Sequence, residues 1–201
     1  MKYKFFKENN DKLIIFFNGW GMDDKIVSHL NRKDFDLLVL YDYRDLDIDL
    51  PEIKHYSEKY LVAWSMGVMV STLFEFDNIK KYIAINGTPK AIDNKYGIPE
   101  RIYKLTVRGF NPDSCKKFME RMFSTMPPID SFSDRTFESQ KEELENLMGL
   151  QGKIVSFDKQ IVSNNDNIIP TKNQLNYWKN PEIINSGHCP FFEYESWLEI
   201  L

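Results

Sequence analysis

Three residues of the types that make up a nucleophilic catalytic triad occur in the chain order Ser65, Asp166 and His188. Each of them follows closely after a short apolar segment of the kind that forms a buried strand. In such a set, the histidine takes the proton of the serine hydroxyl, the serine oxygen attacks an acyl carbonyl, and the aspartate orients the imidazole. The residue types and their positions therefore predict acyl transfer by a serine nucleophile.

Ser65 lies between the apolar run 60–64 and an apolar pattern that is typical of a helix. Small residues, Ala63 and Gly67, flank it, as a sharp strand-to-helix turn that exposes a nucleophile requires. The backbone N–H of Met66 then lies at the start of the helix and can donate to a developing oxyanion. A serine that opens a helix is also a common N-cap, so this motif alone leaves both interpretations open.

The segment Asn18-Gly19-Trp20-Gly21 follows another apolar run, Leu13 to Phe17. Ligands bind beyond the carboxyl ends of strands in open parallel sheets, which makes the backbone N–H of Trp20 the second candidate oxyanion donor. A plain glycine turn is the alternative interpretation of this segment.

Asp166 and His188 each have a simpler interpretation. Asp166 can form an ordinary Asx turn before Pro170, and His188 can be an incidental loop residue. Asp158 is a weaker candidate for the triad, because it lies between two apolar runs rather than after both. The joint occurrence of the three residue types at strand ends favours the catalytic interpretation.

The other histidines and the cysteine next to His188 are poor candidates. His29 and His55 fall on segments where we expect helices, and they are interpreted as surface or packing residues. Cys189 is an alternative nucleophile, but neighbouring residues of an extended loop point in opposite directions, and nothing near Cys189 forms a strand-to-helix turn.

The elements that must position these residues alternate between strands and helices. Strands are expected at residues 2–7, 13–17, 37–41, 60–64, 82–85, 154–157, 160–162 and 182–184. Helices are expected at residues 24–30, 51–59, 66–73, 137–148 and 172–178, after Asn111, and from Phe191 onward. This alternation predicts an α/β fold with a doubly wound, mainly parallel sheet.

Residues 90–150 interrupt the alternation and are expected to form a helical insertion that covers the strand ends as a lid. The insertion contains an apolar helical stripe of Cys115, Phe118, Met119, Met122, Phe123 and Met126. Residues 101–121 also carry six Lys/Arg and only two Asp/Glu. The basic side chains that could dock an acidic carrier protein are Arg101, Lys104, Arg108, Lys117 and Arg121. A solvated helix face is the simpler interpretation.

Composition limits the class of protein. The chain has 201 residues, which we expect to form a single domain, and its net charge of −4 argues against general nucleic-acid binding. Two cysteines are too few for a disulfide framework, and no early apolar run suits a signal peptide or a membrane span. We therefore expect a monomeric cytoplasmic enzyme that needs no metal or other cofactor and does not bind membranes.

Four motifs together resemble those of the α/β-hydrolase superfamily. They are Asn18-Gly19-Trp20-Gly21, Ala63-Trp64-Ser65-Met66-Gly67, Asp166-x-Ile168-x-Pro170 and Gly187-His188-x-Pro190. The order Ser, Asp, His is also the order of that superfamily. The sequence departs from the wider superfamily at Asn18, where His is common, and at Ala63, where Gly is common. Neither change removes a catalytic atom.

Within that superfamily the chain most resembles the BioG-type pimeloyl-ACP methyl ester esterases. The resemblance rests on Phe-Asn-Gly-Trp-Gly-Met-Asp, Ala-Trp-Ser-Met-Gly and Ile-Asn-Gly-Thr-Pro, while residues 90–150 carry no matching motif. It implies hydrolysis of a methyl ester on an acyl chain carried by acyl carrier protein, in biotin synthesis, with the basic residues of the insertion contacting the carrier. The alternatives are a broad-specificity esterase or thioesterase and a catalytically inactive hydrolase fold that serves as a binding module.

Overall fold

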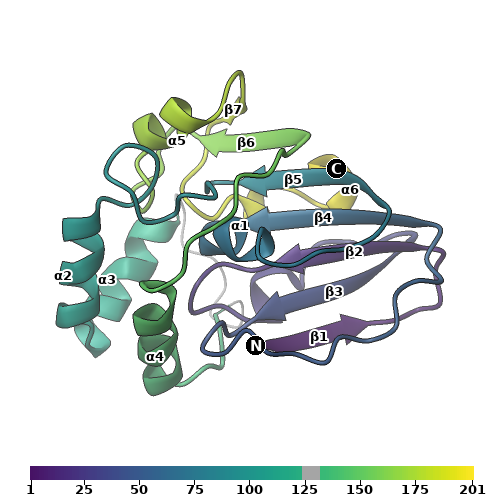
Figure 1. Ribbon diagram of the computed structural model, residues 1–201, viewed down its shortest axis with the longest axis horizontal. Coiled ribbons are helices and arrows are strands. Elements are labelled where there is room, and N and C mark those ends of the chain that lie inside the picture. Colours follow the sequence, from purple (N-terminus) through teal and green to yellow (C-terminus); the bar gives the residue numbers. More distant parts are fainter. Residues whose placement is uncertain (124–131) are drawn as a thin grey trace.

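Seven strands form one sheet in the order β1-β3-β2-β4-β5-β6-β7, in a computed structural model that describes residues 1–123 and 132–201 (Figure 1). The strands are β1 (Lys2–Phe6), β2 (Lys12–Phe17), β3 (Phe35–Tyr41), β4 (Glu58–Trp64), β5 (Ile79–Ile85), β6 (Lys159–Ser163) and β7 (Glu182–Ile184). The edge strand β1 pairs antiparallel with β3, and the other neighbouring strands pair in parallel. The predicted doubly wound, mainly parallel sheet is confirmed.

The helices are α1 (Met66–Ser71), α2 (Glu100–Gly109), α3 (Pro112–Met122), α4 (Phe137–Leu147), α5 (Thr171–Tyr177) and α6 (Trp197–Ile200), with short 3-10 helices η1 (Asp24–Val27) and η3 (Phe191–Glu193). Asn111 caps α3 with a reciprocal capping box, as its position before Pro112 predicts. Figure 1 shows α2, α3 and α4 grouped beyond the carboxyl ends of the parallel strands, although in sequence they lie between β5 and β6.

Both faces of the sheet are covered, which explains why the central strands are continuously apolar. On β2, Ile15 and Phe17 belong to one core cluster and Ile14 and Phe16 to the other. Helix α1 packs on the first face. The second face is covered by the C-terminal segment, where the rings of two buried residues lie close to the Phe16 ring. These are Phe191, with a centroid distance of 5.4 Å, and Trp197, at 5.2 Å.

Two predicted elements are wrong. Residues 51–57 form no helix, and Glu58 instead begins β4, where it pairs in parallel register with Lys12. Residues 154–157 form no strand, because this stretch has no neighbouring strand to pair with and Ile154 is 86% exposed. The chain there crosses over α1 and is held by a bond from the Lys153 backbone N–H to the Thr72 hydroxyl.

Two predicted helices are shorter than expected. The helix expected at 24–30 is the 3-10 helix η1, which ends at Val27, and the helix expected from Phe191 is divided into η3 and α6. His29 lies after the end of η1, and His55 lies in the stretch 51–57, so neither histidine is on a helix. Met126, the last member of the predicted apolar stripe, lies outside the described residues.

The turn between β4 and α1 brings Gly67 into contact with the end of β2. A Cβ atom at Gly67 would lie 2.3 Å from the carbonyl oxygen of Asn18 and 2.4 Å from that of Phe17. Both neighbours are backbone atoms of a buried strand end, so neither can move aside cheaply. Gly87 is restricted in the same way, since its Cβ would lie 2.4 Å from the Ser65 carbonyl oxygen.

We expect Gly67→Ala to lower the free energy of unfolding by roughly 1–3 kcal/mol or more, because its methyl group overlaps fixed backbone oxygens. Chemical denaturation measures this change. Gly109→Ala is the matched control, since a Cβ there has no neighbour within 4 Å, and it should change stability by no more than about 1 kcal/mol. Equal effects of the two substitutions would contradict the close approach.

Candidate active site

The parallel sheet brings the predicted site residues to one edge. Ser65 follows β4 directly, Asp166 comes three residues after β6, and His188 comes four residues after β7. Because these strands are parallel, their carboxyl ends lie on the same side of the sheet. Residues more than a hundred positions apart in sequence therefore meet there.

Ser65, His188 and Asp166 form a hydrogen-bonded line. The Ser65 Oγ lies 2.7 Å from His188 Nε2, and His188 Nδ1 lies 2.8 Å from Asp166 Oδ2. Both the imidazole and the carboxylate are buried. Since the ionised carboxylate can only accept, Nδ1 carries the hydrogen, which leaves the Nε2 lone pair free to accept the serine proton. The structure thus brings together the three residues that the sequence suggested, and their catalytic role stays a prediction.

The Asp166 carboxylate is hydrogen-bonded on both oxygens. Its Oδ1 accepts from the backbone N–H groups of Ile168 and Ile169, each at 2.9 Å. Its Oδ2 accepts from the Gln174 side-chain amide at 2.8 Å in addition to His188. The Asx turn and the contact with histidine are therefore not alternatives, because the same carboxylate makes both.

Two side chains hold the backbone of His188 in place. The His188 carbonyl oxygen accepts from Trp64 Nε1 at 2.8 Å and from Asn86 Nδ2 at 2.9 Å. Asn86 also bonds Ser163 at the end of β6, so one amide links three strand ends. Sequence reasoning gave no role to Asn86 or Gln174. The signal for Asn86 is its place directly after β5, whereas Gln174 carries no comparable signal.

The backbone at Ser65 has the strained conformation of a nucleophile elbow. Its φ of 58° lies in the left-handed region, which costs energy for a residue with a side chain. Ser65 makes no side-chain cap bond to α1. Its hydroxyl is hydrogen-bonded to His188 instead, so the simple N-cap interpretation is wrong.

Two backbone N–H groups near Ser65 are available to a ligand. The N–H groups of Gly19, Gly21 and Met22 all have acceptors within the protein. In the part of the chain that the structure describes, those of Trp20 and Met66 have none. These are the two donors that the sequence suggested for the oxyanion.

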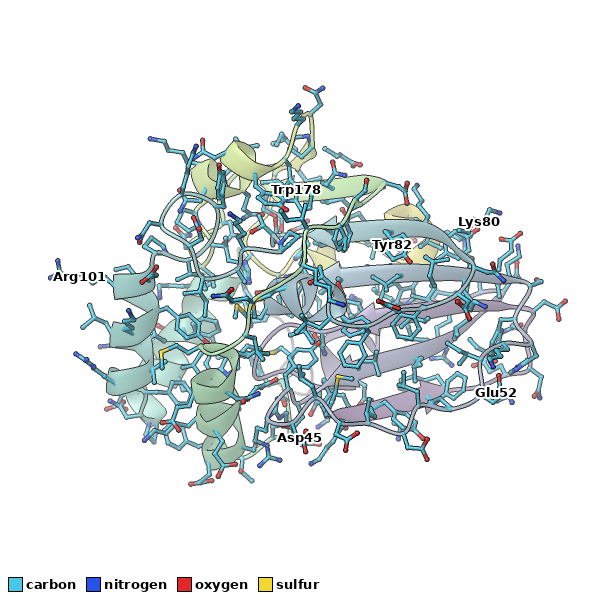
Figure 2. All side chains as sticks on the ribbon, in the orientation of Figure 1. Asp45, Glu52, Lys80, Tyr82, Arg101 and Trp178 are labelled. Carbon is cyan, nitrogen blue, oxygen red and sulfur yellow. The ribbon has the colours of Figure 1, made fainter. Side chains whose placement is uncertain are left out.

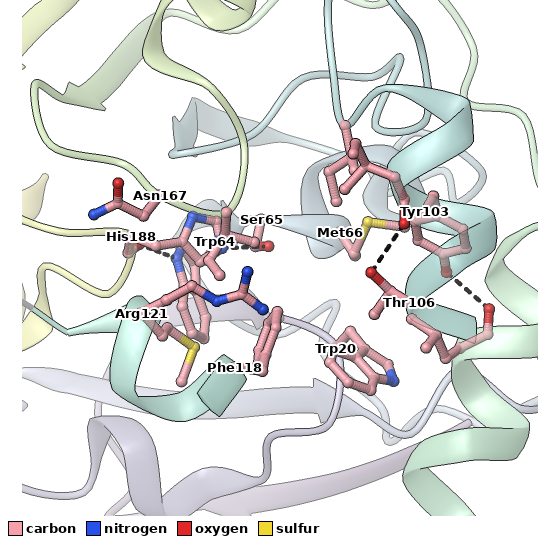
Figure 3. Close-up of a pocket in the computed structure, with 16 residues that line it drawn as sticks. Trp20, Trp64, Ser65, Met66, Tyr103, Thr106, Phe118, Arg121, Asn167 and His188 are labelled. Atoms are coloured by element: carbon pink, nitrogen blue, oxygen red, sulfur yellow. Dashed lines mark hydrogen bonds between the residues drawn. The ribbon is translucent and has the colours of Figure 1, made fainter. Parts of the chain in front are cut away.

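A mostly apolar pocket opens onto Ser65 and His188 (Figure 3). Its apolar lining includes Trp20, Ile98, Tyr103, Phe118, Met122 and Leu144. Helices α2, α3 and α4 supply four of these, so the helical insertion forms the wall opposite the sheet. From the predicted apolar stripe, Phe118 and Met122 line this pocket. Cys115 packs into one core cluster and Phe123 belongs to the other.

Comparison with known proteins identifies the family. A family model described as pimeloyl-ACP methyl esterase BioG matches residues 1–200. The chain belongs to the BioG family. The crystal structure of BioG from Haemophilus influenzae superposes with a TM-score of 0.90 at 31% identity, covering 100% of this chain and 99% of that chain. Membership of an esterase family places the chain among enzymes.

Two further comparisons set the limits of the similarity. A malonyl-[acyl-carrier protein] O-methyltransferase from Bacteroides fragilis is 36% identical over 177 residues, which are 83% of this chain but only 36% of that protein. This chain therefore spans about a third of that relative. A lipase-esterase related protein from Clostridium acetobutylicum superposes with a TM-score of 0.64 at 14% identity, over 95% of this chain and 92% of that one, and it supports the α/β-hydrolase fold alone.

The predicted docking residues lie on α2 and α3. Arg101, Lys104 and Arg108 are exposed along α2 and line one surface groove, and Figure 2 shows Arg101 extending away from the body of the protein. Arg121, on α3, instead lines the pocket with Ser65 and extends toward it in Figure 3. Lys117 is exposed one turn before Arg121. All five predicted docking residues are therefore exposed, and their contact with a carrier stays a prediction.

The competing candidates Cys189, Asp158 and His29 are not part of the hydrogen-bonded line. Cys189 is buried in the core, and this burial raises the pKa of its thiol well above the usual value, which disfavours the thiolate. Asp158 bonds the backbone of Tyr82 near the start of β6, at the opposite end of that strand from Asp166. His29 stacks on Phe192.

No helix within residues 1–123 and 132–201 is both long enough and apolar enough to cross a membrane.

We expect Gln174→Met to lower kcat by about tenfold or more with KM little changed. The substitution keeps the length of the side chain but removes the second donor to Asp166 Oδ2, and a hydrogen bond to a charged group contributes roughly 1.5–3 kcal/mol. Steady-state kinetics on an ester substrate measures it. Asn176→Ala, at an exposed position of the same helix, is the control. A Gln174→Met enzyme with the wild-type kcat and pH profile would show that Gln174 only packs.

Proposed function

We propose that the chain hydrolyses the methyl ester of a pimeloyl group carried on acyl carrier protein, with Ser65 as nucleophile, His188 as general base and Asp166 as the orienting carboxylate. The observation that carries the proposal is the line of 2.7 and 2.8 Å contacts through His188, in a chain that matches the BioG family from residue 1 to 200. The same reaction advances biotin synthesis in this proposal.

The reaction follows from the positions of these groups. His188 Nε2 takes the proton from the Ser65 hydroxyl as the oxygen attacks the ester carbonyl. The N–H groups of Trp20 and Met66 stabilise the negative oxygen of the tetrahedral intermediate. The bond between the carbonyl carbon and the methoxy oxygen then breaks as His188 protonates that oxygen, and methanol leaves. A water molecule activated in the same way releases the carboxylic acid from the acyl-enzyme. Asp166 stabilises the imidazolium without taking its proton.

The substrate class is supported by the shape and charge of the insertion. The apolar pocket wall suits the methylene chain of the acyl group, and the exposed basic residues of α2 suit the acidic surface of a carrier protein. Arg121, on α3, is exposed and also lines the pocket that contains Ser65. In this proposal Arg101, Lys104 and Arg108 contact the carrier, and Arg121 contacts the bound substrate near the reacting end.

We expect Ser65→Ala to reduce kcat on the order of 10⁶-fold while the fold is retained, because no other group in the line can form the acyl-enzyme. Hydrolysis of the carrier-linked methyl ester measures this effect. In cells that lack their own pimeloyl-ACP methyl esterase, the wild-type chain should restore biotin-independent growth and Ser65→Ala should not. Wild-type turnover by the variant would remove the serine-hydrolase mechanism.

A fluorophosphonate probe separates this proposal from an inactive binding module. An activated serine reacts with the probe, so wild type should be labelled and Ser65→Ala should not.

Kinetics on a free methyl ester and on the carrier-linked ester separate the proposed function from a broad-specificity esterase or thioesterase, which would use both equally.

Reversing three charges on α2, by Arg101→Glu, Lys104→Glu and Arg108→Glu together, should lower kcat/KM for the carrier-linked ester about tenfold or more at low salt. Turnover of a small free ester should be unchanged, since these side chains line a separate groove from the Ser65 pocket.

The matched control reverses three exposed lysines away from α2 and gives the same change in net charge. They are Lys4 on the edge strand β1, Lys7 directly after it and Lys54 before β4. This control should leave the carrier-linked ester unaffected. An equal loss for both triple variants, or an equal loss on both substrates, would refute docking on α2.

A further inference from the structure

A buried carboxylate on α4 is bonded to the loop that contains Trp20. The Glu143 side chain is fully buried, and its Oε2 accepts from the backbone N–H of Gly21 at 2.9 Å. Its Oε1 accepts from the backbone N–H of Tyr43 at 2.8 Å. The guanidinium of Arg135 contacts Oε2 at 2.5 Å and supplies the countercharge. The proposed reaction uses none of these groups directly.

The loop itself is a tight turn whose geometry depends on this contact. The Met22 N–H donates to the Gly19 carbonyl oxygen at 3.4 Å, which closes a four-residue turn with Trp20 and Gly21 at its centre. Gly21 has a φ of 76°, the value of the third residue of a type II turn. In a type II turn, the central peptide group is rotated by about 180° relative to a type I turn. The Gly21 N–H belongs to this central peptide, so its bond to Glu143 favours the type II form.

Helix α4 holds the same turn at two further points. The indole N–H of Trp20 donates to the Gln140 carbonyl oxygen at 2.7 Å. The Gln140 side-chain amide donates to the Gly21 carbonyl oxygen at 3.0 Å. Glu143 and Gln140 lie one turn apart on the helix and therefore hold both peptide groups of Gly21 as well as the Trp20 ring. Sequence analysis assigned no role to either residue.

We propose that Glu143 is a positioning residue. By anchoring the Gly21 N–H it holds the adjoining Trp20 in place, so that the free N–H of Trp20 points at the oxyanion formed on attack by Ser65. This inference rests on the proposed function and deepens it. It gives α4 a role in positioning the oxyanion donor as well as in lining the pocket.

The chemistry explains why a carboxylate is needed at this position. Three donors converge on Glu143, from Gly21, Tyr43 and Arg135. A glutamine of the same shape has one acceptor oxygen, and its NH₂ group would face an N–H donor. One of the two backbone N–H groups would then lose its acceptor or move. Arg135 also bonds Asp42 at 3.0 Å, which fixes the countercharge from a second side.

The test is Glu143→Gln in the full chain, assayed on a methyl ester. We expect kcat to fall about 10- to 100-fold with KM little changed. This is a smaller effect than removal of a whole oxyanion donor, which lowers kcat about 10²–10³-fold. A trifluoromethyl ketone that forms a tetrahedral adduct with the serine should lose affinity by a similar factor, because it needs the same N–H groups.

Glu142→Gln is the matched control. Glu142 is the preceding residue of the same helix, is exposed, and pairs with Arg44 on the surface, so its substitution should leave kcat and inhibitor affinity at wild-type values. Thermal unfolding of both variants establishes the fraction folded at the assay temperature.

Three outcomes would overturn the inference. They are a Glu143→Gln enzyme that is less stable but has the wild-type kcat when folded, a rise in KM without a fall in kcat, and an unchanged affinity for the ketone. Failure of the proposed function is recognised separately, since wild type itself would then not hydrolyse the ester or Ser65→Ala would remain active.

Discussion

A fully buried carboxylate must be hydrogen-bonded on both of its oxygens, and the Asp166 side chain of this protein meets that requirement with four donors. Two of them are backbone N–H groups of its own loop, and the other two come from Gln174 and His188. Because the loop satisfies one oxygen by itself, the other oxygen is aimed at the imidazole. The orientation of His188, and with it the contact to Ser65, depends on the fact that Oδ1 bonds the loop and Oδ2 bonds the imidazole.

The same principle applies to Glu143, which is bonded to the loop of Trp20. Glu143 is also fully buried and is satisfied by backbone N–H groups and by Arg135. Burial raises the pKa of Glu143, while Arg135 and the two N–H groups act in the opposite direction. Two buried carboxylates thus anchor two segments of the site, Asp166 bonding the His188 imidazole and Glu143 bonding the loop of Trp20. Asp166 lies in the loop after β6 and Glu143 lies on α4, and neither segment is part of the sheet.

The strained turn at Ser65 is closely packed by the ends of two neighbouring strands. Gly67 lies against the carbonyl oxygens at the end of β2, and Gly87 lies against the carbonyl oxygen of Ser65. The positive φ of Ser65 is therefore maintained by contacts with two neighbouring strands. Membership of the BioG family agrees with this arrangement, and α2, α3 and α4 give the pocket beside Ser65 an apolar wall.

The sequence by itself determined the sheet, the strand-to-helix turn and the three residues that meet in the hydrogen-bonded line. Those features depend on local signals, namely continuous apolar runs and small residues beside Ser65. Local signals failed at 51–59 and 154–157, where the deciding factor was whether a neighbouring strand was available for pairing. The roles of Gln174 and Glu143 became visible only in the tertiary structure, whereas Asn86 carries the signal of its place directly after β5. A buried polar side chain has a role only through partners that are distant in sequence, and no local pattern records which groups the fold will bring next to it.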